Sequence, residues 1–348
     1  MNQKIRHYTP IPTQWVGPIK IIGNTVNDEV KVPLATYETP LWPSTNRGAK
    51  ISLLCGGIRA TIIDERMTRS VVLKADNAQQ ALDTLTHLHE NFSLLQKVVA
   101  KTSRYARLID LHSQIIGHLL FLRFECTTGD ASGHNMVTKA ADALILWIIE
   151  QHPTLSYASI SGNYCIDKKA SAVNGILGRG KNVVTEMVIP EAVLTKNLRT
   201  TAEKMVTLNT QKNHIGSNIA GSLRSANAHF ANMLLAFYLA TGQDAANIIE
   251  GSQGIVHCEV RDKDLYFSCS MPNLIVGTVG NGKGQDLAMV EEHLQALGCR
   301  EQRNPGENAR RLAAICAATV FCGELSLLAA QTNPGELMRS HIAMERKG

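Results

Sequence analysis

Several features that mark special classes of protein are missing from this 348-residue sequence. It contains no run of five or more Lys and Arg residues, and its formal net charge is only +5, so a nucleic-acid-binding surface is not indicated. Its eight cysteines include no CxxC pair, which argues against a zinc site and fits free thiols in a reducing compartment. We therefore expect no metal, and the modest basic bias suits small anionic ligands.

Long apolar runs are also missing. The longest runs, Met233 to Ala240 and Ala143 to Ile149, fall far short of the roughly 18 residues that a membrane span requires. Residues 1–14 carry Lys4 and Arg6 but no apolar stretch of signal-peptide length. We expect a cytoplasmic protein that binds neither membrane nor nucleic acid. Its 44% hydrophobic content can fill one large core or two smaller ones.

Residues 161–169, Ser-Gly-Asn-Tyr-Cys-Ile-Asp-Lys-Lys, bring one carboxylate and two ammonium groups together directly after an apolar run. Leu155 to Ile160 predicts a short strand, and Gly162-Asn163 favours a turn. Adjacent lysines repel each other, so a buried one needs a partner such as Asp167. A lysine held at the edge of a site can stabilise a developing oxyanion. Taken alone, the segment is better explained as a solvated turn with charges on its surface.

Hydrophobic periodicity predicts a separate unit over residues 70–160. Its strand candidates are Val71–Lys74, Tyr105–Ser113, Leu119–Cys126 and Leu155–Ile160. Its helix candidates are residues 78–99, with a break near Asn91, and Asp130–Gln151. Asp76 and Gln79 resemble a capping pair at the first helix, and Asp130 can cap the second. The order strand, helix, strand, strand, helix, strand is that of a ferredoxin-like split βαβ arrangement.

The remaining segments predict a larger unit of strands and helices. The expected elements are strands within 16–41, a strand Asn182–Ile189, a helix after Pro190, a long helix Ile219–Ala240 ending at Gly242, a hairpin of Ile255–Val260 and Leu265–Met271, and helices Gln285–Ala296 and Asn308–Ala330. Asp244 follows the end of the long helix, where the helix dipole does not favour a carboxylate. Its pKa should therefore rise, or it should have a cationic partner.

Residues 161–169 closely resemble the lysine loop of hydroxymethylglutaryl-CoA reductases, and other blocks of that family recur in the same order. These blocks are Ser44-Thr45-Asn46-Arg47-Gly48, Met67-Thr68-Arg69, Gly242-Gln243-Asp244-Ala245-Ala246, Gly277-Thr278-Val279-Gly280 and Asn304-Pro305-Gly306-Glu307-Asn308-Ala309-Arg310. The resemblance runs from about residue 30 to the C-terminus and implies an α+β protein. Residues 1–69 and 161–348 would form a large mixed α/β domain built round a long central helix. Residues 70–160 would form an inserted, small ferredoxin-like domain that binds the cofactor.

The resemblance also implies roles for individual residues. Four would be catalytic: Glu38 as proton donor, Lys168 as oxyanion stabiliser, Asp244 as the link between them, and His341 as the acid that protonates the departing thiolate. Cofactor-binding positions would be Ser103, Arg104, Tyr105, Asp130, Ser132, Gly133, His134, Asn135, Met136, Gly280 and Gly282. Substrate-binding positions would be Ser44, Arg47, Arg69, Ser161, Asp167, Lys169, Lys212 and Asn232, while His229 would be structural. Ser132 departs from the methionine usual in the family, and His134 occupies a variable position.

The implied reaction reduces hydroxymethylglutaryl-CoA to mevalonate and free CoA with two NADPH, through a hemithioacetal and mevaldehyde. Ser103-Arg104-Tyr105 resembles the block that faces the adenine ribose in the NADPH-using class I branch, where an arginine can pair with a 2′-phosphate. The resemblance also implies a homodimer or homotetramer with active sites at a subunit interface. Two alternatives remain: an enzyme that degrades mevalonate oxidatively with NAD, and a non-catalytic CoA- or dinucleotide-binding regulator.

Overall fold

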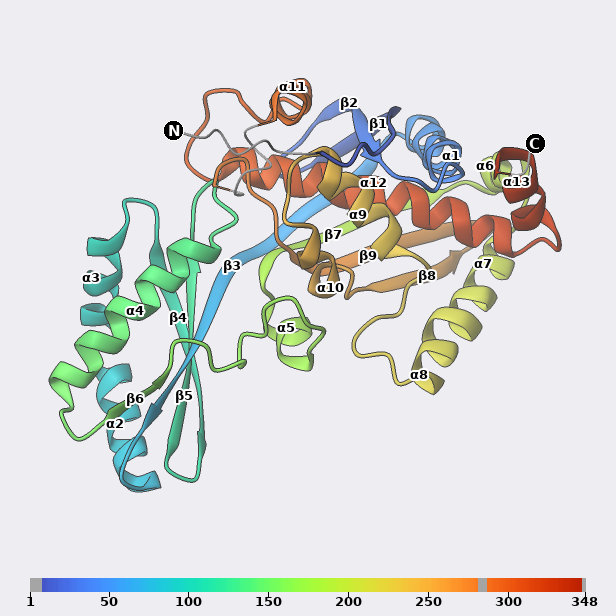
Figure 1. The fold of residues 1–348 in the computed structure, drawn as a ribbon. Coiled ribbons are helices and arrows are strands. Elements are labelled where there is room, and N and C mark those ends of the chain that lie inside the picture. The colour runs from blue at the N-terminus through green and yellow to red at the C-terminus, as the bar shows by residue number, and fades with distance from the viewer. Residues whose placement is uncertain (1–7, 281–286, 346–348) are drawn as a thin grey trace.

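One long strand, β3 (Ile58–Lys74), connects the two halves of the protein in the computed structural model, which describes residues 8–280 and 287–345 (Figure 1). The side chains of residues 340, 341 and 343–345 are outside the described part. The first half of β3 pairs with β1 (Thr13–Gly23) and β7 (Gly180–Ile189). Its second half pairs with β5 (Leu119–Thr127) and β6 (Ser156–Ser159). A single strand therefore belongs to two sheets.

The sequence predicted only the last four residues of β3. Charges at Asp64, Glu65 and Arg66 interrupt the apolar alternation in the middle of this strand. In the structure these charges have partners: Arg66 pairs with Asp64 and Glu125, and Glu65 lies 2.7 Å from Arg310. Since ion pairing satisfies these groups, the strand continues through them.

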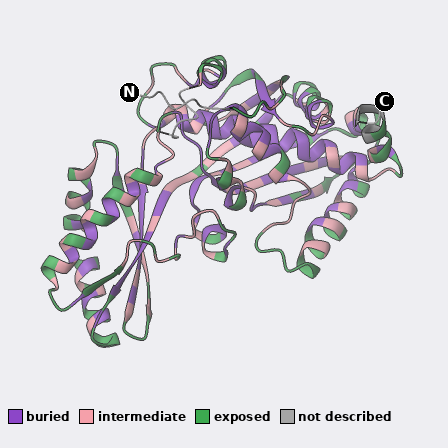
Figure 2. Cartoon of the chain, in the orientation of Figure 1, coloured by how far each residue is buried: buried purple, intermediate pink, exposed green. Residues whose placement is uncertain are grey.

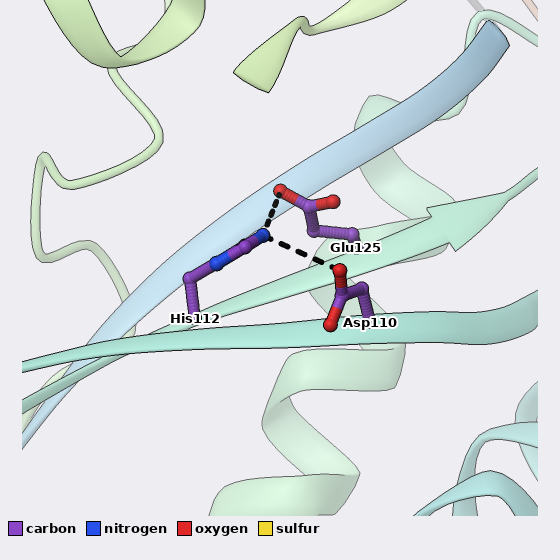
Figure 3. Close-up of side chains that lie close together, drawn as sticks. All are labelled: Asp110, His112 and Glu125. Atoms are coloured by element: carbon purple, nitrogen blue, oxygen red, sulfur yellow. Dashed lines mark ion pairs between the residues drawn. The ribbon is translucent and has the colours of Figure 1, made fainter. Parts of the chain in front are cut away.

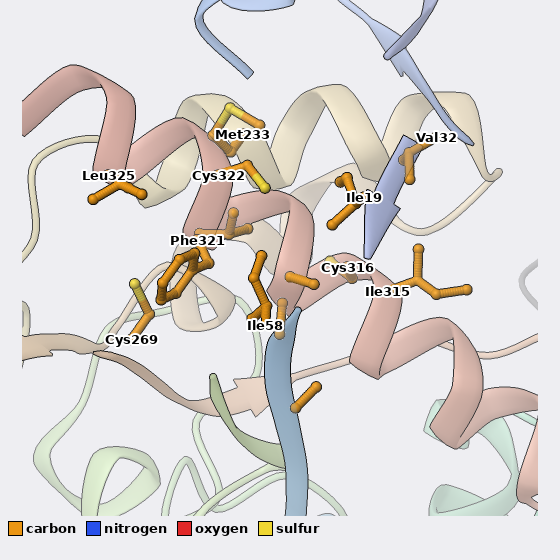
Figure 4. Packing of buried hydrophobic residues seen from close by; sticks show 14 of the residues in the cluster. Ile19, Val32, Ile58, Met233, Cys269, Ile315, Cys316, Phe321, Cys322 and Leu325 are labelled. Atoms are coloured by element: carbon orange, nitrogen blue, oxygen red, sulfur yellow. The ribbon is translucent and has the colours of Figure 1, made fainter. Parts of the chain in front are cut away.

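The large unit is built on a sheet of order β2-β1-β3-β7-β9-β8, with β2 (Asp28–Ala35), β8 (Ile255–Arg261) and β9 (Asp264–Leu274). Helices α1 (Leu41–Leu54), α9 (Phe230–Ala240) and α12 (Glu307–Gln331) pack with it. Figure 4 shows Phe321 of α12 among Cys269, Leu325 and other core side chains, and its ring meets Phe267 edge-on at 5.0 Å.

Helix α12 is the long central helix. By length and composition it could cross a membrane, but 94% of its most apolar window is buried inside the protein. Figure 2 shows it as an almost continuous buried ribbon through the large unit. It is therefore packed as a core helix.

The small unit has the predicted order of elements. Its strands run β4-β5-β3-β6, with β4 (Arg107–Ile116), and all neighbours are antiparallel. Helices α2 (Ala78–Glu90), α3 (Phe92–Thr102) and α4 (His134–Gln151) cover one face and enclose a separate hydrophobic cluster (Figure 1). The break between α2 and α3 falls at Asn91, as expected. The predicted α+β class with a ferredoxin-like insertion is confirmed.

One predicted helix cap in the small unit is wrong by one residue, and one predicted helix start is wrong by four residues. Asn77, not Asp76, caps α2: its side chain accepts the Gln80 N–H, and Gln80 Oε1 accepts the Asp76 N–H at 2.6 Å. The cap is thus one residue later than predicted, and Gln80 reaches the N–H of the residue before the cap and not that of the cap itself. Helix α4 begins at His134 because Gly133 is left-handed (φ 96°). Asp130 instead accepts the Ala309 N–H at the start of α12.

The predicted long helix over 219–240 is also wrong. The chain forms α7 (Ala202–Leu208), a π-helix η2 (Asn209–Gly216) and a single turn α8 (Ser217–Ile219), and α9 starts only at Phe230. The buried Glu324 carboxylate of α12 accepts the backbone N–H groups of Ala228 and His229 just before α9. These bonds satisfy N–H groups that a continuous helix would have used internally.

The other predicted elements are close to those observed. The hairpin β8–β9 is present, a short helix follows Pro190, and Gly242 is left-handed after α9. The remaining helices are α5 (Ala172–Leu177), α6 (Glu191–Val193), the π-helix η1 (Leu194–Leu198), the 3₁₀ helix η3 (Ala245–Asn247), α10 (Ile248–Gly251), α11 (Ala288–Ala296) and α13 (Glu336–Glu345).

The contact between α1 and α12 allows a direct test of core packing. A β carbon at Gly48 would lie 2.1 Å from the Cys322 carbonyl oxygen. Gly48→Ala should therefore destabilise the protein by about 1–3 kcal/mol or more through overpacking. Gly216→Ala is the matched control, because the nearest atom would be Gln211 O at 3.5 Å. Thermal unfolding of both variants should show a lowered midpoint for Gly48→Ala alone; equal losses would reject the close approach of α1 and α12.

Candidate active site

Lys168 and Asp244 form an ion pair at the centre of the candidate site. Lys168 Nζ lies 2.7 Å from Asp244 Oδ2, and Lys168 has a left-handed backbone (φ 58°). The Lys168 N–H donates to Glu250 Oε1, and Asp244 accepts the Ala246 N–H as the cap of η3. The hydrogen bond to Asp244 raises the pKa of Lys168 against the effect of desolvation. Of the two outcomes expected for Asp244, the structure shows the cationic partner.

The Asp244 carboxylate stays ionised. Burial opposes its ionisation, but the hydrogen bond from Lys168 and the Ala246 N–H outweigh burial, and its pKa lies below the usual value. Of the two alternatives, the cationic partner is therefore present and the pKa does not rise. Both partners are charged over the neutral pH range, so Lys168 presents a full positive charge at a position that is 39% exposed.

Asp167 is held by groups from several elements. Arg179 lies 3.0 Å from Asp167 Oδ1, and Asn247 Nδ2 and His134 Nε2 lie 3.5 and 3.6 Å from the same oxygen. Burial opposes the ionisation of Asp167, but the nearby His134, Arg179 and Lys168 keep its pKa well below the usual value. Asp167 is thus a fixed anion beside the Lys168 ammonium group.

Sequence reasoning missed two residues that support this arrangement. Arg179 is almost completely buried and pairs with Glu250 at 2.7 Å as well as with Asp167. Glu250 also accepts the Lys168 N–H and an Asn247 amide hydrogen. In the sequence Arg179 stands between two glycines, which have positive φ in the structure, but glycines predict a turn and not a buried charge.

A second charged network lies on strands β4 and β5 of the small sheet. Figure 3 shows His112 Nε2 between Asp110 and Glu125, at 3.4 and 3.6 Å. Among the described residues, this trio is the group that could hold a metal ion. However, Glu125 already pairs with the guanidinium groups of Arg66 and Arg123. Two cations at one carboxylate oppose the binding of a third, so the trio is better explained as an ion-pair network.

The expected cofactor positions gather at the start of α4. The Asp130 carbonyl accepts the N–H groups of Thr278 and Val279, which places the 277–280 loop beside this block. Gly133 is tightly enclosed, since a β carbon there would lie 2.6 Å from the Thr128 side chain. Asn135 is exposed at the first turn of α4, and Met136 packs against the small core.

The third expected cofactor segment lies next to this block. A β carbon at Gly129 would be 3.5 Å from Tyr105, and the Arg104 guanidinium lies 5.5 Å from the Tyr105 ring centre. Ser103 Oγ accepts the Tyr105 N–H. The structure thus brings the Ser103–Tyr105, Asp130–Met136 and Gly277–Gly280 segments together. Gly282 lies outside the described residues.

Four other expected residues line a cavity of about 340 Å³ between α1, α9, α12 and α13: Glu38, Ser44, Arg47 and Asn232. Glu38 Oε2 accepts a hydrogen bond from Asn232 at 2.7 Å. Ser44 Oγ bonds to Ser326, and Arg47 bonds to Ser326 and to Glu336 of α13, at 2.7 Å. His229 also lines this cavity, with Nδ1 2.9 Å from the buried Glu324.

The remaining expected residues surround the lysine loop or the cavity. Arg69 Nε donates to the Ile160 carbonyl, the Ser161 N–H donates to Ser159 Oγ, and Lys169 Nζ donates to the Asp167 carbonyl. Lys212 in η2 donates to Asn213, and burial lowers its pKa. His341 lies in α13, but its side chain is outside the described part. Among the contacts of the described residues, none joins Glu38 to Lys168 or Asp244.

The sequence of this chain is similar to those of one known enzyme family. Residues 5–346 match the family model described as hydroxymethylglutaryl-coenzyme A reductase. The 3-hydroxy-3-methylglutaryl-coenzyme A reductase of Pyrococcus abyssi is 45% identical over 97% of this chain and 81% of its own length. The Xenopus laevis protein of the same name is 41% identical over 97% of this chain but only 38% of its own length.

Solved structures agree at the level of the fold. The class II 3-hydroxy-3-methylglutaryl-CoA reductase from Streptococcus pneumoniae bound to NADPH superposes with a TM-score of 0.74. It is 19% identical and covers 95% of this chain and 88% of the other. The structural likeness supports the fold, and the match of the family model over almost the whole sequence shows that this chain belongs to the hydroxymethylglutaryl-coenzyme A reductase family.

Proposed function

We propose that this protein reduces hydroxymethylglutaryl-CoA to mevalonate and free CoA with two NADPH, as a step of isoprenoid biosynthesis. The observation that carries the proposal is the Lys168–Asp244 ion pair beside Asp167, next to the segment expected to bind the dinucleotide. Relatives with 41–45% identity carry the name of this reductase, which supports the substrate.

Each proposed catalytic group has a physical task. Each hydride transfer to a carbonyl creates an oxyanion, and a charge such as that of Lys168 at about 4 Å is worth roughly 4 kcal/mol at an effective dielectric near 20. Asp244 keeps Lys168 protonated. Glu38, held by Asn232, would supply protons. His341 would protonate the CoA thiolate, whose thiol should resemble cysteine with a pKa near 8.5.

The separation of the two groups within one chain supports a subunit-interface site. Lys168, Asp167 and Asp244 form one group, while Glu38 and Asn232 form another. The chemistry requires a proton donor close to the oxyanion, so a second copy of the chain would bring the groups together. A homodimer or homotetramer remains our prediction.

Domain boundaries, cellular location and class assignment are also proposals. Two hydrophobic clusters, one mainly within 16–60 and 183–329 and one mainly within 67–155, support division near residues 69/70 and 160/161. The burial of α12 supports the predicted cytoplasmic location. The Ser103-Arg104-Tyr105 block supports the class I branch. The NADPH-bound Streptococcus pneumoniae structure is described as class II, so NADPH by itself does not decide the class.

One assay separates the proposal from its alternatives. Purified protein should oxidise NADPH when hydroxymethylglutaryl-CoA is added, measured at the reduced-nicotinamide absorbance band with NADH in parallel. Preference for NADH together with faster oxidation of mevalonate would favour the degradative alternative. Binding without turnover in either direction would favour a regulator.

Removal of the Lys168 ammonium group tests the oxyanion role. Lys168→Ala should lower kcat by at least about 10² to 10³ while hydroxymethylglutaryl-CoA still binds. Lys169→Ala is the matched control, because Lys169 Nζ bonds to a backbone carbonyl and is exposed. The control should affect KM more than kcat. Near-native kcat in Lys168→Ala, with a large loss in Lys169→Ala, would move the role to Lys169.

Arg104 tests the cofactor preference. Arg104→Ala should raise KM for NADPH far more than for NADH, because only NADPH carries the 2′-phosphate that the guanidinium can bind. Arg107, which is also exposed and begins β4, provides the control Arg107→Ala, expected to change neither value. Initial rates with both cofactors check this. A similar rise for NADPH and NADH would reject the assignment of Arg104.

His341 tests the protonation of the leaving group. An unprotonated CoA thiolate can add back to mevaldehyde, whereas supplied mevaldehyde needs no such proton. His341→Gln should therefore strongly reduce turnover of hydroxymethylglutaryl-CoA and largely spare the reduction of mevaldehyde. Parallel assays measure the rates with the two substrates. Equal losses of rate with both substrates would contradict this role and indicate that α13 acts as a general lid.

A further inference from the structure

His134 lies between the expected dinucleotide site and the lysine loop. It is the first residue of α4, and its Nδ1 lies 3.5 Å from Ser132 Oγ. On the other side, its Nε2 lies 3.6 Å from Asp167 Oδ1. The imidazole therefore bridges a segment of the small unit and a carboxylate of the lysine loop.

The His134 Nε2 atom is buried, although the side chain as a whole is 22% exposed. It has no hydrogen-bond partner among the described residues. At 3.6 Å the distance to Asp167 is too long for a normal hydrogen bond, whose donor–acceptor distance is about 2.7–3.2 Å. A shift of roughly half an ångström would complete the bond, so this contact can tighten when either neighbouring segment moves.

Several charges face this imidazole. The carboxylates of Asp167 and Asp244 both gain stability in their ionised form from His134. The cations around the same carboxylates are Arg179, which pairs with Asp167, and Lys168, which pairs with Asp244. A proton on His134 would therefore be attracted by two anions and repelled by two cations. Asp167 is the carboxylate that lies 3.6 Å from His134 Nε2, so this attraction draws the imidazole toward Asp167.

We propose that His134 is a positioning residue that couples dinucleotide binding at the start of α4 to substrate binding at Asp167. This inference rests on the proposed function, because it takes the ligands of both sites from it. A dinucleotide held by the first turn of α4 fixes the backbone of residues 132–135 and brings the imidazole against Asp167. Asp167 is then fixed in the orientation that receives substrate. By thermodynamic linkage, substrate must raise dinucleotide affinity by the same factor.

Calorimetry with an unreactive ligand pair measures this coupling. NADP⁺ and hydroxymethylglutaryl-CoA cannot exchange a hydride, so each can be titrated alone and in the presence of the other. In the unaltered protein, each ligand should tighten the other by at least about 5-fold, the lower end of typical coupling. In His134→Ala the factor should fall close to one, so that neither ligand tightens the binding of the other.

A conservative variant separates charge from packing. His134→Gln retains an N–H donor that can reach Asp167 but carries no charge. It should keep part of the coupling.

Two controls keep the test specific. His87→Gln removes a half-buried histidine of the same unit, paired with His152 and not with a carboxylate, and should leave turnover and coupling unchanged. In an Asp167→Asn background, His134→Ala should cause no further loss of coupling, because the partner is already neutral. Unfolding midpoints of all variants show whether each one folds.

The outcomes are distinct. Absence of coupling in the unaltered protein, or full coupling in both His134 variants, overturns the role of His134 and leaves the proposed function intact. If the unaltered protein binds neither ligand and does not oxidise NADPH with hydroxymethylglutaryl-CoA, the proposed function fails and this inference fails with it. Loss of coupling in His134→Ala with partial rescue in His134→Gln supports the inference.

Discussion

The buried ion pair between Arg179 and Glu250 holds the candidate site together. Both side chains are almost completely removed from solvent, and Glu250 Oε1, which accepts from Arg179, also accepts the Lys168 N–H and an Asn247 amide hydrogen. Burial raises the pKa of Glu250, while Arg179 and these donors oppose that rise. Removing one partner of such a pair generally costs about 3–5 kcal/mol, because the other charge is left buried and unpaired. The left-handed backbone at Lys168 therefore has a rigid support, and its ammonium group is held toward Asp244.

Strand β3 explains why the two units meet where they do. Since one strand serves both sheets, the segments entering and leaving the small unit must pass its middle, where Glu65 and Arg66 lie. Asp130 reinforces this junction by accepting the Ala309 N–H of α12 and, through its carbonyl, the N–H groups of the 277–280 loop. The start of α4 is thus tied to the large unit by hydrogen bonds, and Ile275 of the large unit also joins the hydrophobic cluster of the small unit. Such contacts permit small relative movements while preserving orientation.

The hydrophobic pattern of the sequence predicted secondary structure correctly where one face of an element is clearly apolar. The βαββαβ order of the small unit follows from alternation in residues such as Leu120, Leu122 and Phe124, all of which are buried. The hydrophobic pattern failed where a residue far away in the sequence determines the backbone conformation. Glu324, almost a hundred residues further along the chain, accepts the backbone N–H groups just before Phe230 and so prevents the expected continuous helix. In β3, ion pairs stabilise three charged residues and allow the strand to continue past them. The contact of Lys168 with Asp244 was expected only through family resemblance. Arg179 and Glu250 were missed because burial cannot be read from the residue type.

A second ion pair, at the cavity beside Glu38, involves a residue expected to bind substrate. Arg47, the residue expected on the CoA side, is occupied by Glu336, at the first position of α13. Under the proposed function, an anionic group of CoA that reaches Arg47 competes with this carboxylate. Because α13 also contains His341, release of Glu336 would free the helix that carries the proposed thiolate acid. Ligand entry and the position of this helix are then linked through the Arg47–Glu336 ion pair, whose side chains are 26% and 11% exposed.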